Sequence, residues 1–147
     1  MAFLQVKDIL KRAVEFHKKL IDFYSKIENV SEKESVKLLV DYMARHESIL
    51  KDELSKISTE QEQQLLNEWV KYDLELVACR CFESLKIDKN SSVDDVIDAG
   101  LELNQCLIDY YHHMSEIAAM EDMKALFANL EVMEIAEKKK LARMRGM

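Results

Sequence analysis

Four side chains at the otherwise apolar positions of predicted helices carry donor groups that proteins commonly use to bind transition metals. His17 and His46 supply imidazoles, and Glu134 and Glu137 supply carboxylates. A set of two imidazoles and two carboxylates suits iron, manganese or zinc. The same groups can instead satisfy one another through charge-assisted hydrogen bonds without a metal. Both interpretations require that the fold bring the four residues together.

The two histidines interrupt helical stripes that are otherwise apolar. The spacing predicts a helix from about Val6 to Glu28. Its stripe consists of Val6, Leu10, Ala13, His17, Leu20, Tyr24 and Ile27. Ser31 and Glu34 have the spacing of a capping box that opens a second helix. The stripe of that helix consists of Val36, Leu39, Met43, His46 and Leu50.

Three more helices are predicted in the rest of the chain. Thr59 and Glu62 form another capping box, which predicts a helix that runs to about Leu85. One side of it carries Leu65, Trp69, Tyr72, Leu76 and Cys79. After the polar stretch IDKNSS, Ser91 or Ser92 caps a helix that reaches about residue 118. The last helix runs from about residue 121 to 145, and its closing turns hold basic side chains that suit the negative end of a helix dipole.

An internal repeat connects the first part of the chain with the last. LIDFY at residues 20–24 matches LIDYY at residues 107–111, a shift of 87 positions. The surrounding residues match at the same shift, and a shift of 91 aligns the partner helices so that Met43 meets Glu134 and His46 meets Glu137. Glu134 and Glu137 therefore occupy stripe positions, where a buried carboxylate needs a cation, a histidine, a metal or a proton.

Composition predicts the all-α class. The 147 residues contain no proline and only two glycines, too few for the turns of an all-β protein. The net charge of -7, with acids and bases interspersed, argues against binding to nucleic acid or to an anionic membrane. No apolar run could span a bilayer, and the start lacks a secretory signal, so we expect a cytoplasmic protein. The three cysteines, Cys79, Cys81 and Cys106, are expected to be reduced thiols.

These elements predict one domain over residues 1–147, a four-helix bundle of two repeated helical hairpins. Hairpin one covers residues 5–57, a mostly helical crossover covers 58–90, and hairpin two covers 91–147. The helix order, the repeat and the polar pairs resemble the ferritin-like superfamily, closest to its rubrerythrin-like branch. In that family the first and third bundle helices each give a glutamate, and the second and fourth each give Glu-x-x-His. Six such residues hold two iron or manganese ions that react with oxygen or peroxide.

The resemblance implies a changed ligand set in this chain. The first family glutamate falls on His17 and its repeat partner on Asn104. The second-helix motif falls on the segment Met43 to His46, and the last falls on the segment Glu134 to Glu137. Only two of the six family ligands keep their identity. We therefore expect at most a single metal held by His17, His46, Glu134 and Glu137, with Asn104 as a weak oxygen ligand.

Two functions follow from this ligand set. The first is a redox or metal-handling protein with one iron, manganese or zinc ion, which would be a metal-dependent oxidoreductase if it is an enzyme; no catalytic residue is assigned. The alternative is a metal-free scaffold or interaction module that has lost the di-iron site. Haem ligation by His17, Met43 or His46 is a third interpretation. The resemblance also implies a homodimer, and any redox or protein partner is unidentified.

Overall fold

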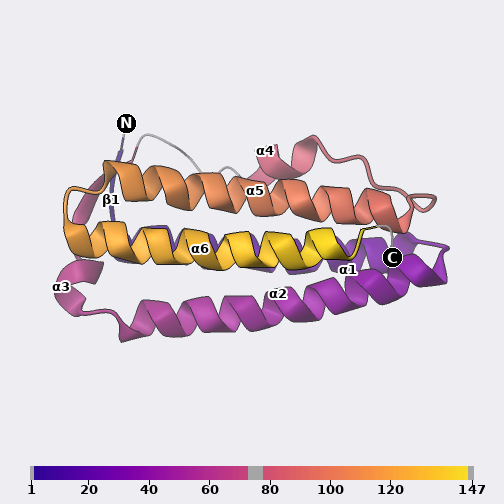
Figure 1. Cartoon of the computed structure of the whole chain (residues 1–147), viewed down its shortest axis with the longest axis horizontal. Coiled ribbons are helices and arrows are strands. Elements are labelled where there is room, and N and C mark those ends of the chain that lie inside the picture. Colours follow the sequence, from indigo (N-terminus) through magenta and orange to yellow (C-terminus); the bar gives the residue numbers. More distant parts are fainter. Residues whose placement is uncertain (1, 73–77, 146–147) are drawn as a thin grey trace.

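Four long helices form the body of the molecule in the computed structural model, which describes residues 2–72 and 78–145. Two of them, α1 (Val6–Val30) and α2 (Glu34–Glu60), form the first antiparallel hairpin. The other two, α5 (Val93–Ile117) and α6 (Glu121–Arg143), form the second. The hairpins lie side by side along their full length and enclose one shared core (Figure 1). The predicted all-α bundle of two hairpins is confirmed.

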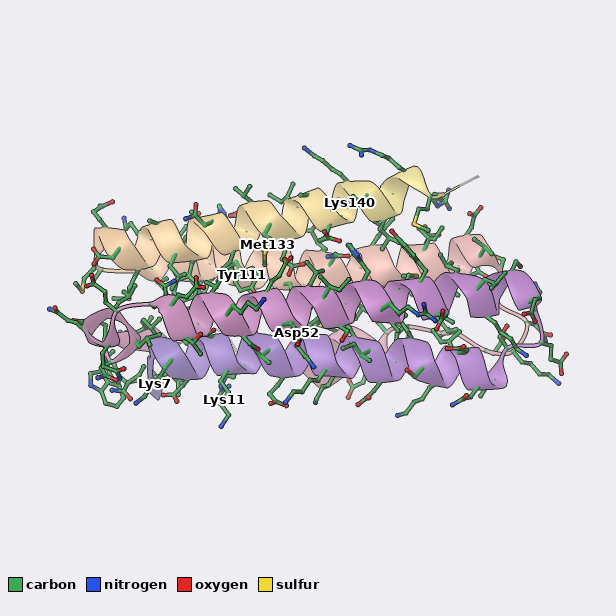
Figure 2. The ribbon with its side chains drawn as sticks, turned by 90° about the horizontal axis from the view of Figure 1, so that it is seen from below. Lys7, Lys11, Asp52, Tyr111, Met133 and Lys140 are labelled. Carbon is green, nitrogen blue, oxygen red and sulfur yellow. The ribbon has the colours of Figure 1, made fainter. Side chains whose placement is uncertain are left out.

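The buried faces of the helices follow the predicted spacing closely. All seven stripe residues predicted for α1 are buried, His17 among them. In α5 the capping box is formed by Ser92, whose hydroxyl accepts from the backbone of Asp95 at 3.1 Å, and whose own backbone donates to the Asp95 carboxylate at 2.8 Å. Figure 2 shows Tyr111 inside the bundle and Lys7 and Lys11 projecting outward from α1. The apolar interior is therefore built by the 3–4 spacing itself.

The start of α2 differs from the prediction. Its N-cap is Lys33, which gives no side-chain cap, so the capping box predicted from Ser31 and Glu34 is wrong. The Ser31 hydroxyl instead accepts from the backbone nitrogen of Lys33 at 3.1 Å. This local turn uses the serine that lies two residues before the N-cap, a common competing role for serine.

The single helix predicted from about Thr59 to Leu85 in the crossover is also wrong. α2 extends to Glu60, and short elements follow: α3 (Gln63–Leu66), a strand β2 (Trp69–Tyr72) and α4 (Ala78–Glu83). The strand pairs antiparallel with β1 (Ala2–Gln5), in register Gln5 with Trp69. The aromatic and β-branched residues of 69–72 favour a strand once a partner strand is near. Leu76 and the side chain of Cys79, both placed on the predicted helix, lie outside the part that the structure describes.

No helix in the described part of the chain has the length and apolar character needed to cross a bilayer.

Candidate metal centre

Each of the four bundle helices places a buried polar side chain at one level of the core. α1 contributes His17, α2 contributes Glu47, α5 contributes Asn104 and α6 contributes Glu134. Their exposed fractions are 0%, 7%, 5% and 0%. Polar groups so far from water are stable only when they are paired or neutralised. The contacts among them decide what this level of the bundle can do.

His17 lies between two carboxylates. Its Nδ1 donates a hydrogen bond of 2.6 Å to Oε2 of Glu47. Its Nε2 lies 3.1 Å from Oε1 of Glu134, close enough for an ion pair. The orientation of this second contact does not meet hydrogen-bond geometry, and both atoms are buried without a hydrogen-bond partner. One strong hydrogen bond and one incompletely satisfied contact therefore hold the ring.

The protonation of His17 follows from this setting. Burial by itself lowers the pKa of an imidazole, but the carboxylates of Glu134 and Glu47 outweigh it and raise the pKa from 6.5 to about 10. At neutral pH the ring is then an imidazolium with a proton on each nitrogen. The carboxylates respond differently: burial raises the pKa of Glu47, while His17 opposes that rise. The charges of Glu134 and Glu137 raise the Glu47 pKa further, so both carboxylates are close enough to Glu47 to disfavour its ionised form.

The second hairpin holds Glu134 from its other side. Nδ2 of Asn104 donates to Oε2 of Glu134 at 3.1 Å. Two buried tyrosines complete the surroundings, and the Tyr111 hydroxyl has no hydrogen-bond partner. Burial and the charge of Glu47 keep the pKa of Tyr24 well above 10, and burial and Glu134 do the same for Tyr111. Both phenols therefore stay neutral at physiological pH.

His46 and Glu137 form a separate pair nearer the surface. His46 Nε2 lies 2.5 Å from Oε2 of Glu137, and Lys140 donates to the other oxygen at 3.3 Å. The His46 side chain is 30% exposed and stacks on Tyr42 with ring centroids 5.9 Å apart. The prediction that His46 sits at the centre of the α2 stripe is thus wrong.

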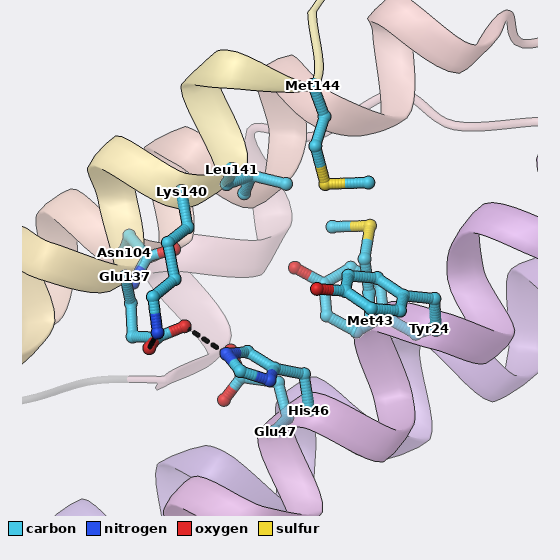
Figure 3. A pocket seen from close by; sticks show the side chains of 10 residues that line it. Tyr24, Met43, His46, Glu47, Asn104, Glu137, Lys140, Leu141 and Met144 are labelled. Atoms are coloured by element: carbon cyan, nitrogen blue, oxygen red, sulfur yellow. Dashed lines mark hydrogen bonds and ion pairs between the residues drawn. The ribbon is translucent and has the colours of Figure 1, made fainter.

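A small cavity separates this pair from the end of the bundle. Its volume is about 30 Å³, which is room for about two water molecules. Figure 3 shows Glu47, His46 and Glu137 on one side of it and the thioethers of Met43 and Met144 on another. The cavity therefore reaches the edge of the buried polar level, and its polar wall includes one of the His17 partners.

Glu47 is the site residue that the sequence analysis missed. Along the buried side of α2 the steps run from Leu39 to Met43, then four residues to Glu47 and three to Leu50. The alignment with a shift of 91 residues instead continued the stripe from Met43 by three residues, to His46. Either step fits a helical stripe, so periodicity alone could not decide.

A uniform shift of 87 residues corrects the repeat. It relates His17 to Asn104 and Glu47 to Glu134, and both pairs are 30 residues apart in the chain. Six of the seven buried residues of α2 map onto the buried residues of α6 at the same shift. These are Val36, Leu39, Val40, Met43, Glu47 and Leu50 of α2, which map onto Met123, Leu126, Phe127, Leu130, Glu134 and Glu137. The shift of 91 proposed for the partner helices is therefore wrong by one helical turn.

The corrected register changes the carried-over ligand pattern. The glutamates of the two Glu-x-x-His motifs now fall on Glu47 and Glu134, and both are present. The histidine positions fall on Leu50 and Glu137, and the remaining glutamate positions on His17 and Asn104. Two carboxylates at the heart of the family pattern are kept, and their flanking ligands are changed.

The residues present fit one metal ion better than two. Among the described residues, no three His, Cys, Asp or Glu side chains already surround a common point as metal ligands do. Glu134 Oε1 and His17 Nε2 are nevertheless two potential metal-ligand atoms. Both are buried, they lie 3.1 Å apart, and neither makes a hydrogen bond. Three carboxylates cannot neutralise two dications, and the apolar Leu50 is buried at a position where the resemblance implies a histidine.

Sequence comparison and structure comparison give different results. The sequence matches no protein-family model and no curated protein. The structure is similar to the crystal structure of a candidate ferritin-like diiron-carboxylate protein from Thermotoga maritima, with a TM-score of 0.64 and 16% sequence identity. The match covers 99% of this chain and 97% of that one. The predicted fold class is therefore confirmed: this chain has the ferritin-like fold.

Proposed function

We propose that this chain is a ferritin-like metal-binding protein, related to the rubrerythrin-like branch, that holds one divalent iron, manganese or zinc ion in a redox or metal-handling role. The observation that carries the proposal is the unsatisfied contact between Glu134 Oε1 and His17 Nε2 at the centre of the bundle. The proton on His17 Nε2 makes an ion pair with this carboxylate but no hydrogen bond of good geometry, and a metal ion that replaced the proton could bind both atoms as ligands.

Charge supports a single ion. When ionised, Glu47, Glu134 and Glu137 bring three negative charges, and Lys140 beside Glu137 brings one positive charge. Without metal, the imidazolium of His17 leaves this group one negative charge in excess. A divalent ion that replaces the His17 proton would make the group neutral. A second divalent ion would leave an excess of two positive charges inside the bundle, which burial disfavours.

The surrounding residues have separate tasks in this proposal. Glu47 and Glu134, held by opposite hairpins, are the central oxygen ligands. His17 contributes a nitrogen once its proton has left, and Asn104 orients Glu134 through its hydrogen bond. His46 and Glu137 lie beside the small cavity and control access to it. A bound iron or manganese ion would supply one-electron chemistry there, whereas zinc would supply Lewis acidity alone.

One observation favours the metal-free alternative. Both nitrogens of His17 already face carboxylates, so a protonated ring can hold Glu47 and Glu134 together without a cation. In that case the site is a buried ion-pair network and the chain is a scaffold or an interaction module. The two functions differ in whether a metal ion or a proton is bound to Nε2 of His17 beside Glu134.

Metal content measured in two variants decides between them. We expect wild-type protein, reconstituted anaerobically with Fe(II), Mn(II) or Zn(II) and desalted, to retain about one equivalent of one of these ions by elemental analysis. The Glu47→Gln, Glu134→Gln double variant should lose it. Glu53→Gln, an exposed glutamate on the same helix, is the matched control and should bind as wild type does. No retained metal in the wild type would support the scaffold, and two equivalents would contradict the single-ion site.

The homodimer and the cytoplasmic location remain predictions. Exposed apolar side chains of Leu38, Tyr42 and Ile49 follow one face of α2 and would suit a contact with a second copy. Light scattering of wild type against a Leu38→Glu, Ile49→Glu variant would test that contact.

A further inference from the structure

Two cysteine thiols meet where the crossover touches the bundle. Cys81 belongs to α4 and Cys106 to α5, two helices that are in contact, and the two thiols are close enough for Cys81 to influence the ionisation of Cys106. Both residues are half-buried free cysteines that pack against the main core. Figure 1 shows α4 lying along α5. The contact therefore joins two segments that are 25 positions apart in the chain and belong to different parts of the fold.

Aromatic packing holds Cys81 in this place. The ring of Phe82, the next residue, lies 5.7 Å from Phe16 and 5.3 Å from Phe23, measured between centroids. Phe16 and Phe23 belong to α1, so α4 is anchored to α1 through Phe82 and to α5 through Cys81. Such packing limits how far the Cys81 thiol can move from Cys106. Proximity of this kind raises the effective concentration of one thiol at the other.

We propose that Cys81 and Cys106 form a reversible dithiol and disulfide pair that fastens α4 to α5 when the protein is oxidised by a small-molecule disulfide. The oxidised form would close a covalent loop across the crossover segment, and the reduced form is the one described above. The pair lies outside the set of candidate metal ligands, so the proposal does not depend on a bound metal.

The exchange balances without any group beyond the added disulfide. In the first step the Cys81 thiolate attacks one sulfur of the oxidant, which gives a mixed disulfide and releases one small thiol. In the second step the Cys106 sulfur attacks Sγ of Cys81, the protein disulfide forms and the second small thiol leaves. The two cysteines are oxidised by two electrons in total, the oxidant is reduced by two, and the two thiol protons end on the two released thiols.

The surroundings of Cys106 suggest the order of the two steps. Burial, the neighbouring Cys81 thiol and the charges of Asp109 and Glu102 raise the pKa of Cys106 to about 12. Its thiolate is therefore scarce at neutral pH, so Cys106 is suited to the second, intramolecular step. The two carboxylates would also repel an anionic oxidant, so a neutral disulfide is the better probe.

Peptide mapping tests the pairing directly. The full chain is treated with oxidised 2-mercaptoethanol in the presence of EDTA, alkylated, digested with trypsin and analysed by mass spectrometry without reduction. Trypsin cleaves after Arg80 and therefore puts the two neighbouring cysteines in different peptides, Cys79 in the peptide 72–80 and Cys81 in the peptide 81–86. We expect the peptide 81–86 joined to 90–124, which contains Cys106, with the loss of two hydrogen atoms.

Three single variants provide the controls. Cys81→Ser and Cys106→Ser should each stop at a mixed disulfide with 2-mercaptoethanol, whereas Cys79→Ser should still form the internal bond. Oxidation should raise the melting temperature of wild type and of Cys79→Ser by several degrees, because the new bond restricts the unfolded chain. Wild-type protein that stops at mixed disulfides, or a main product that links peptide 72–80 to 90–124, would overturn the proposal. The wild-type map remains decisive even if a serine variant folds poorly.

Discussion

Asn104 holds Glu134 in the second hairpin at the same 30-residue separation at which His17 holds Glu47 in the first. In one pair the donor is an imidazole at 2.6 Å, and in the other it is an amide at 3.1 Å. The two glutamates are thus equivalent members of a repeat whose donors have diverged. The divergence places a single titratable cation, His17, between two buried carboxylates.

Removing the charge of Glu47 should weaken the fold. Glu47→Gln takes away the 2.6 Å partner of His17 Nδ1 and leaves the imidazolium with Glu134 alone. We expect a loss of about 3 kcal/mol in the free energy of unfolding, the lower end for breaking a buried ion pair. Urea denaturation in the presence of EDTA measures it. Glu53→Gln, exposed on the same helix, should change stability by less than about 0.5 kcal/mol, and an equal loss in both variants would count against the network.

Stability of the metal-free protein should fall as the pH rises from 6.5 to about 10. In that window folded protein keeps the His17 proton, because its pKa is raised to about 10, while the unfolded chain releases it near pH 6.5. The His17 contribution is fully present below pH 6.5 and is lost through the folded pKa, at a limiting slope of about 1.4 kcal/mol per pH unit. Urea unfolding at several pH values should show the slope.

Two histidine variants assign that slope. His17→Gln should flatten it, because the titrating group is gone. His112→Gln removes an exposed histidine whose pKa is raised by hydrogen bonding to Glu131, and it should leave most of the slope in place. A wild-type slope that survives in His17→Gln would show that another group is responsible.

Metal binding should release a proton. If the ion coordinates Nε2 of His17, that nitrogen must lose the proton that it carries at neutral pH. About one proton should therefore be released per ion bound at pH 8. Titration calorimetry in two buffers of different ionisation enthalpy counts it. Asn104→Ala, which keeps His17, is the control and should release the same number. Binding without proton release would exclude His17 as a ligand and leave the glutamates and His46.

An added methyl group at Gly100 should destabilise the fold, because three side chains would have to shift to make room for it. A Cβ there would come within 2.7 Å of Leu141 Cδ2 and 2.9 Å of both the Met43 methyl and the Tyr24 hydroxyl oxygen. Alanine normally favours a helix over glycine by about 1 kcal/mol, but the crowding should dominate and destabilise Gly100→Ala by about 1 to 3 kcal/mol. Thermal unfolding measures the effect. Adding Tyr24→Phe removes one of the three close contacts and should recover part of the loss; simple additivity of the two changes would contradict the crowding.

The sequence predicted the bundle well because its information there is redundant. Seven stripe residues of α1 agree on one face, and the Ser92 cap and the LIDFY repeat each support the same arrangement independently. The crossover had no such support. Its strand depends on pairing Trp69 with Gln5, a contact between distant parts of the chain that local spacing cannot reveal.

The candidate site was predicted in part for a related reason. Of the residues predicted as candidate ligands, His17, Asn104 and Glu134 are buried at one level, and Glu137 lies at its edge. The choice between His46 and Glu47 depended on a single step of three or four residues in α2. Only the three-dimensional pairing of His17 with Glu47 settles that step, and with it the register of the repeat.

The two halves of the 87-residue repeat differ chemically at the site. Two hairpins related by one uniform shift place Glu47 and Glu134 at equivalent positions of the repeat. His17 opposite Asn104, and Leu50 opposite Glu137, break this equivalence, so one half of the site is cationic and apolar while the other is amide-lined and acidic. A bound ion would therefore meet different neighbours in the two hairpins, an imidazole in the first and an amide in the second.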